Sequence, residues 1–270
     1  MKAGKWDARI ARARELGAKY LFAAEGLLFY EKLAGFQKFL HGALQKAHAS
    51  PKAFRSQASL QDPPNLDFLL PHFPAFLSSI EQNAPTLLSE AARDLRKQEP
   101  PQWRNILSGF WDPGSGTREI APTEMLISWM FMQPYAEFLA ERAGEIPADT
   151  TPSRCPLCSG KPLVGVLRPE GEGGKRSLIC ALCATEWVYR RILCPGCGEG
   201  DVHKLPIYTA EEFQDVRVEA CDSCRSYIKT VDLTMEGRAV PVVDELMTIP
   251  LNLWAAEHNY SKIHPNILGI

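Results

Sequence analysis

Four short turns decide the fold of the C-terminal half of this chain: Cys155-Pro156-Leu157-Cys158, Cys180-Ala181-Leu182-Cys183, Cys194-Pro195-Gly196-Cys197 and Cys221-Asp222-Ser223-Cys224. Together they contain all 8 cysteines of the sequence. A C-x-x-C turn directs two thiolates to the same side of a tight loop, where they occupy two corners of a tetrahedral metal site, and a second turn supplies the other two. The pattern therefore predicts metal binding.

The spacing of the turns predicts how they pair. Cys158 and Cys180 are separated by 21 residues, and Cys197 and Cys221 by 23, slightly more than in the C-x₂-C-x₁₅₋₂₀-C-x₂-C template. Pairing in chain order gives two sites, with Cys155, Cys158, Cys180 and Cys183 in the first and Cys194, Cys197, Cys221 and Cys224 in the second. Four thiolates accept zinc and also a single iron ion of the rubredoxin kind, so we expect two metal ions, iron or zinc.

Other uses of paired cysteines are reactive dithiols of the thioredoxin kind and disulfides. Four pairs with β-forming segments between them favour metal over reactive dithiols. A reducing compartment, which the sequence indicates below, disfavours disulfides. Only Cys194 to Gly198 has the glycine after its second cysteine that is familiar from rubredoxin turns. The sequence does not choose between zinc and iron.

Outward from the turns, the order of segments occurs twice. In the first copy Leu163–Leu167, Ser177–Ile179 and Trp187–Tyr189 are expected strands, and in the second copy Lys204–Tyr208, Val216–Glu219 and Tyr227–Val231 are. The offset between the copies is 39 residues from Cys155 to Cys194 and 41 from Cys183 to Cys224. We interpret this as an internal duplication of one hairpin module.

The first 145 or so residues follow the helical period instead. Residues 6–45 predict one long helix or two, with glycines where it could bend. Pro100 and Pro101 are expected to end a helix, and Pro134 to kink or divide the apolar helix Glu124 to Arg142. The aromatic residues of that helix are expected in the core rather than around a ligand: Trp129, Phe131, Tyr135 and Phe138. Near residues 147–153 a linker rich in Pro, Ser and Thr interrupts the period.

The predicted fold class is thus α+β with several domains. We expect an all-α helical domain at 1–146, a first four-cysteine rubredoxin-like or zinc-ribbon module at 147–192 and a second at 193–241. Residues 242–270 are expected to form a C-terminal helix and tail, with Pro250 in a first turn or at a kink.

Composition and charge limit the function classes. The net charge is −2, and neither half of the chain is a basic domain, which argues against a nucleic-acid partner. No segment approaches the roughly 18 consecutive apolar residues of a membrane span. The N-terminal residues Met1 to Arg9 carry charges where a signal peptide needs an apolar core, so we expect a cytoplasmic protein. We interpret Tyr189-Arg190-Arg191 as a solvated strand end rather than as a contact for a phosphate or an acidic partner.

Catalysis has little support in the sequence. The closed four-cysteine sites leave no open metal position, the six histidines form no H-x-x-x-H pair, and no nucleotide, dinucleotide or hydrolase motif is present. We therefore expect a binding module and not an enzyme, with metal sites that hold a small domain together as structural zinc does.

The whole chain resembles the formate dehydrogenase accessory protein family (FdhE). The four cysteine turns carry the resemblance, together with Gln133 to Ala140 and a tail that runs from Asp244-Glu245-Leu246 through Leu253 to Glu257 and ends in Pro265 to Gly269. The resemblance implies a helical N-terminal domain, two rubredoxin-like modules with iron as the suggested metal, and a cytoplasmic chaperone that binds the catalytic subunit of formate dehydrogenase.

Two other functions stay open at this point. A zinc-ribbon nucleic-acid-binding protein would use the paired ribbons and Arg190-Arg191, and a rubredoxin-like electron-transfer or thiol-redox protein would use the cysteines themselves. The surface that binds a partner is not indicated by the sequence.

Overall fold

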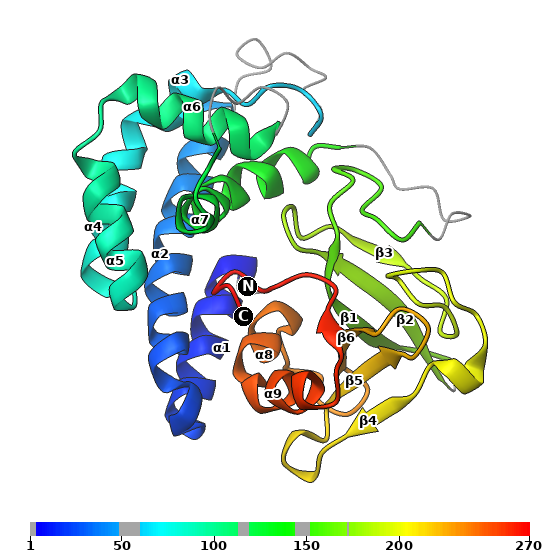
Figure 1. Ribbon diagram of the computed structural model, residues 1–270. Helices are drawn as coiled ribbons and strands as arrows, with labels where there is room; N and C mark the ends of the chain where they lie inside the picture. The colour runs from blue at the N-terminus through cyan, green and yellow to red at the C-terminus, as the bar shows by residue number, and fades with distance from the viewer. Residues whose placement is uncertain (1–3, 49–59, 113–118, 144–151, 172) are drawn as a thin grey trace. The chain divides into compact units, whose positions relative to one another are not determined.

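A computed structural model describes residues 4–48, 60–112, 119–143, 152–171 and 173–270 (Figure 1). Its contacts divide the chain into two compact units, residues 1–28 with 144–270 and residues 29–143. Helices come first, then a mixed β-sheet with both cysteine clusters, then short C-terminal helices, which confirms the predicted α+β class. The predicted linker at 147–153 lies largely outside the described residues, and the four predicted domain boundaries stay a prediction.

The N-terminal helical pattern forms two helices. Helix α1 (Lys5–Lys19) ends at Tyr20, whose extended backbone (φ −119°, ψ 91°) cannot continue a helix. A 3₁₀ turn (Leu21–Ala23) leads into α2 (Ala24–Ala47). The glycines at which the sequence predicts a bend, Gly26, Gly35 and Gly42, all lie inside α2. The helix tolerates them because a single glycine costs only about 1 kcal/mol there.

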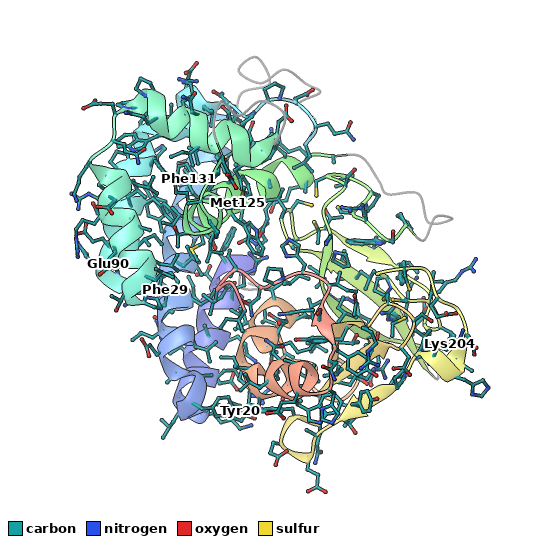
Figure 2. The ribbon with its side chains drawn as sticks, in the orientation of Figure 1. Tyr20, Phe29, Glu90, Met125, Phe131 and Lys204 are labelled. Carbon is teal, nitrogen blue, oxygen red and sulfur yellow. The ribbon has the colours of Figure 1, made fainter. Side chains whose placement is uncertain are left out.

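Residues 29–143 pack helices around an aromatic core. After α2 come α3 (Leu66–Leu69), a 3₁₀ turn (Leu70–His72), α4 (Phe73–Asn83), α5 (Thr86–Arg96), α6 (Pro100–Trp111) and α7 (Pro122–Ala140). Figure 2 shows Phe131 of α7 inside this unit, where its ring centroid lies 4.8 Å from that of Phe73 and 5.2 Å from that of Phe76. The four aromatic residues of α7 are all buried, as the sequence predicts.

The structure changes the expectations about two proline positions. Pro100 and Pro101 do not end a helix but open α6, because proline lacks the N–H that the first turn of a helix leaves unpaired. Of the two expectations for Pro134, division of the helix is wrong, because α7 is one continuous helix from Pro122 to Ala140; the kink stays a prediction.

The other unit is built on one sheet, which has seven strands among the described residues. The strands are β1 (Pro162–Glu170), β2 (Gly173–Cys180), β3 (Glu186–Val188), β4 (Ile207–Thr209), β5 (Val216–Cys221), β6 (Ser226–Asp232) and β7 (Ser261–Lys262). Their order is β3-β2-β1-β6-β5-β4, and β7 pairs with β6. Strands β1 to β3 pair antiparallel and so do β4 to β6, which agrees with a duplicated module. The second copy departs from expectation at Val202–Lys204, which is a 3₁₀ turn, so β4 starts at Ile207.

The two copies join through a parallel pairing of β1 and β6 (Figure 1). Gly165 of β1 faces Thr230 of β6, and a Cβ atom on Gly165 would lie 2.3 Å from the Thr230 Oγ1 atom. A glycine is therefore required where the two modules meet.

Two short helices, α8 (Pro241–Met247) and α9 (Ile249–Glu257), follow the sheet. Helix α8 packs on β1 and β6, and α1 packs on α8 (Figure 1). Pro250 lies in the first turn of α9, one of the two predicted places. Within the described ranges, no helix combines the length and the hydrophobicity that crossing a bilayer requires.

Candidate metal centres

Each cysteine turn is a backbone hydrogen-bonded loop. The N–H of Ser159 donates to the Cys155 carbonyl at 2.8 Å, and the Cys155 N–H donates to the Gly160 carbonyl at 2.8 Å. In the same way the Gly198 N–H donates to the Cys194 carbonyl at 2.9 Å, and the Arg225 N–H donates to the Cys221 carbonyl at 2.8 Å. The loops hold both cysteines of a turn on one side of the backbone.

The residue after the second cysteine has a left-handed backbone in all four turns. The φ angles are 59° at Ser159, 53° at Ala184, 80° at Gly198 and 56° at Arg225. Only one of these residues is glycine, although non-glycine residues rarely adopt this conformation. The same left-handed turn is thus present four times, whereas the glycine pattern identifies it once.

The turns bring the eight sulfur atoms into the two sets of four that the spacing predicts, Cys155, Cys158, Cys180 and Cys183 in one and Cys194, Cys197, Cys221 and Cys224 in the other. In each set all four Sγ atoms lie within 4.8 Å of one another. All eight cysteines are free thiols.

The sulfur geometry fits a tetrahedral ion. Metal–sulfur bonds of about 2.3 Å give a tetrahedron with edges of about 3.8 Å. The Sγ–Sγ distances are 3.7 Å for Cys194–Cys224 and 3.7 Å for Cys197–Cys221. In the first cluster Cys158 and Cys180 lie 3.3 Å apart, slightly closer.

Backbone N–H groups also point at the sulfur atoms. Gly160 donates to the Cys158 Sγ atom at 3.4 Å, Leu182 to that of Cys180 at 3.4 Å and Gly196 to that of Cys194 at 3.3 Å. Hydrogen bonds of this kind stabilise a thiolate and are the outer contacts that tune a bound metal. The two clusters are therefore able to hold metal ions.

The pKa values of the thiols move in different directions within each cluster. Hydrogen bonds from Cys158 and its neighbours lower the pKa of Cys155, whereas the interaction with Cys155 raises the pKa of Cys180. In the second cluster burial raises the pKa of Cys194. Burial would also raise that of Cys224, but hydrogen bonds from Ser226 lower it to about 7. Adjacent thiols thus ionise unequally, and a bound cation would favour the thiolate form at all four positions.

The two clusters differ in exposure. The first has three buried cysteines and one of intermediate burial, Cys158. The second has two buried cysteines, with Cys224 intermediate and Cys197 exposed. The geometry of the two sites is alike, and their access to solvent is not.

The last turn is attached to the C-terminal segment. Arg225 stacks over the ring of Tyr260 at 3.9 Å, and the Tyr260 hydroxyl donates to Asp222. The Arg225 guanidinium also donates to the carbonyls of His258 and Asn259. These contacts fix the Cys221–Cys224 turn against residues that follow α9.

Sequence reasoning missed a buried charged network beneath the sheet. Asp244 and Glu245 of α8 are fully buried. Asp244 accepts hydrogen bonds from Arg12 of α1 at 2.5 and 3.0 Å, and Glu245 pairs with Lys229 of β6 at 2.8 Å and with Lys262 of β7. Adjacent acids in an otherwise apolar helix, Asp244-Glu245-Leu246-Met247, were the available signal.

The Tyr189-Arg190-Arg191 segment has structural contacts. Tyr189 is buried, its hydroxyl donates to the Cys194 carbonyl at 3.2 Å, and Arg176 lies over its ring at 5.2 Å. Arg191 donates to the Gly174 carbonyl at 2.6 Å. The segment thus connects the two modules.

Comparison with protein families matches the part of the chain that contains the clusters. A family model described as "FdhE, central domain" matches residues 154–191, and one described as "FdhE, C-terminal domain" matches residues 192–268. Each matched range contains one complete four-cysteine cluster.

Several curated relatives are named "Protein FdhE homolog". The relative from Aquifex aeolicus is 28% identical over 201 residues, which are 74% of this chain and 70% of the relative. The one from Pseudomonas aeruginosa is 30% identical over 214 residues, 76% of this chain and 66% of the relative. The match to the Stutzerimonas stutzeri relative is 35% identical and spans 42% of this chain and 37% of the relative.

A solved structure has the same fold. The crystal structure of the FdhE protein from Pseudomonas aeruginosa superposes with a TM-score of 0.71 at 23% identity, covering 99% of this chain and 97% of that chain. The family models, the relatives and the shared fold agree with one another, and the chain belongs to the FdhE family.

Proposed function

We propose that this protein is a non-catalytic accessory factor for the assembly of formate dehydrogenase, acting in the cytoplasm on the catalytic subunit of that enzyme. The observation that carries the proposal is the pair of matches to the central and C-terminal FdhE domains, each with an intact cysteine cluster. Family membership supports the task.

The site chemistry supports a role without catalysis. Each cluster offers four sulfur ligands and no open position, whereas catalytic zinc keeps a position for water or substrate. We propose that Cys155, Cys158, Cys180 and Cys183 hold one ion and that Cys194, Cys197, Cys221 and Cys224 hold another. Zinc would act as a cross-link in either site, and iron would add a one-electron redox couple.

The modular architecture suits this role. The turns of both clusters lie at the ends of strands of one sheet, and Gly165 and Tyr189 connect the two modules. A bound ion would cross-link the turns at the strand ends, and the resulting rigid surface is what a partner can recognise.

A pull-down of the full-length chain tests the proposal. Tagged protein is recovered from cells that produce formate dehydrogenase, and bound proteins are identified by mass spectrometry after nuclease treatment. We expect the catalytic subunit among them. A matched variant, Cys155→Ser with Cys194→Ser, breaks both clusters and controls for binding that depends on their integrity. Recovery of nucleic acid and no enzyme subunit would refute the proposal.

A genetic test separates assembly from synthesis. Cells that lack the protein should contain the catalytic polypeptide but lose formate-dependent dye reduction, and the wild-type gene should restore it. Normal enzyme activity without the protein would contradict an accessory role.

A further inference from the structure

The two clusters have the same ligands and different surroundings. In the first, Cys155, Cys180 and Cys183 are 1 to 3% exposed and Cys158 is half-buried. The second has Cys197 on the surface and Cys224 half-buried. The two sites therefore differ in one exposed ligand, Cys197.

The backbone around the sulfur atoms differs in the same direction. A Cβ atom on Gly160 would lie 3.1 Å from the sulfur atoms of both Cys158 and Cys180, so the chain closely covers the first cluster. Next to Cys197, a Cβ atom on Gly198 or Gly200 would meet nothing within 4 Å. The Cys197 side of the second cluster is thus open.

The four ligands of the second cluster are also held unequally. Cys194 is buried and its carbonyl accepts the Tyr189 hydroxyl, while the Cys221–Cys224 turn is fixed by Arg225 against the segment after α9. Two hydrogen bonds connect the loop after Cys197 to the opposite turn: the Ser223 hydroxyl donates to Glu199 at 2.6 Å, and the Asp222 N–H donates to the Lys204 carbonyl at 2.9 Å. Lys204, labelled in Figure 2, belongs to the same loop. Its ammonium lies 3.8 Å from the Glu199 carboxylate. Of the four, Cys197 has the fewest constraints from packing.

We propose that the second cluster is an exchangeable site at which Cys197 gives way to an external thiolate, while the first cluster is a permanent structural site. The Cys197 sulfur leaves as a thiolate and the incoming thiolate takes its coordination position, so charge and electron count are unchanged and no oxidant or reductant is needed. The inference rests on metal occupancy of both clusters, as in the proposed function, and adds a ligand class and a residue role to it.

Metal release from the fully loaded chain tests the inference. The protein is loaded with zinc, mixed with the chromogenic chelator 4-(2-pyridylazo)resorcinol, and alkylated with iodoacetamide at intervals for mass spectrometry. We expect two phases of one ion each, with Cys197 labelled first and the cysteines of the first cluster labelled in the slow phase. A single phase, or earlier labelling of the first cluster, would overturn the inference. Loading of fewer than two ions would instead contradict the proposed metal sites.

A pair of matched variants connects the fast phase to the second cluster. Ser223→Ala removes the exposed hydrogen bond to Glu199 and should speed the fast phase by roughly three- to tenfold, as loss of an ordinary hydrogen bond does. Thr185→Val removes the hydroxyl that lies 3.0 Å from the Cys183 sulfur and should change only the slow phase. If Ser223→Ala left the fast phase unchanged, the role of Cys197 would be wrong.

Two thiolate sources are distinguished by adding each to the release experiment. Glutathione should speed the fast phase if small thiols enter the site. If instead a cysteine of the partner enters the site, the purified catalytic subunit should speed the fast phase and glutathione should not. Acceleration by neither would refute exchange with a thiolate.

Discussion

Replacement of Glu245 by glutamine tests the buried charged network. The Glu245 carboxylate is fully buried and pairs with the ammonium of Lys229, also fully buried, at 2.8 Å. Breaking a buried pair by removing one partner costs about 3 to 5 kcal/mol. Glutamine keeps an oxygen that accepts hydrogen bonds, and Lys229 keeps its bonds to the carbonyls of Glu245 and Thr248, so we expect a loss near 3 kcal/mol in the free energy of unfolding.

The loss should depend on pH. Burial lowers the pKa of Lys229 to about 8, although the nearby Glu245 carboxylate partly raises it again. In the unfolded chain the pKa is about 10.4, so the unfolded chain binds this proton more tightly, and stability from Lys229 rises with pH between these values. Without the Glu245 charge the folded pKa of Lys229 falls further. The deficit of Glu245→Gln is therefore largest in mild acid and shrinks as the pH rises through 8.

Urea unfolding of the metal-loaded protein, followed by circular dichroism at about pH 6 and about pH 9.5, measures both effects. Glu170→Gln is the matched control, because Glu170 pairs with Lys175 on the surface and the exchange should cost under about 1 kcal/mol. A deficit of Glu245→Gln as small as that of the control, or one equal at both pH values, would refute the assigned role of the pair.

Four other predictions follow from the contacts of the sheet and its helices. Gly165→Ala should lower the free energy of unfolding by about 2 kcal/mol in urea titrations, because its Cβ meets Thr230, and Thr230→Ala should restore part of the loss in the double variant. Ala184→Gly should raise the free energy of unfolding by about 0.5 to 1 kcal/mol and the melting temperature with it, since glycine adopts the left-handed backbone of this position without strain; a lower melting temperature would contradict this. Arg12→Met should cost about 3 to 5 kcal/mol because it leaves the buried Asp244 carboxylate unpaired, and a neutral result in urea unfolding would refute the pairing. Prolonged chelation should abolish the strand signal in circular dichroism and retain helical signal, because every cysteine lies outside residues 29–143; complete resistance of the sheet would show that it folds without metal.

Local features of this fold could be predicted from sequence. The grouping of eight cysteines follows from the C-x-x-C spacing and pairing in chain order, and the hairpins β1–β2 and β4–β5 follow from apolar runs between the cysteine turns. Each of these features depends on residues near one another in the chain, where spacing restricts the geometry.

Contacts between distant segments could not be predicted. The parallel pairing of β1 with β6 and the Arg12–Asp244 ion pair, 232 residues apart, leave no periodic signal in a single sequence. The left-handed residues Ser159, Ala184 and Arg225 were missed for another reason: the usual sign is glycine, and here the hydrogen-bonded loop imposes the conformation on other residues.

Metal analysis tests the central claim most directly. Protein purified without air is examined by elemental analysis and absorption spectroscopy, which distinguishes coloured iron–thiolate sites from colourless zinc sites. We predict two ions per chain in the wild-type protein. We predict one ion per chain when Cys155→Ala breaks the first cluster, because Cys158, Cys180 and Cys183 then no longer hold an ion while the second cluster keeps its own. If the Cys155→Ala protein kept a full complement at the Cys180 pair, the two four-cysteine centres would not be the sites that this fold builds.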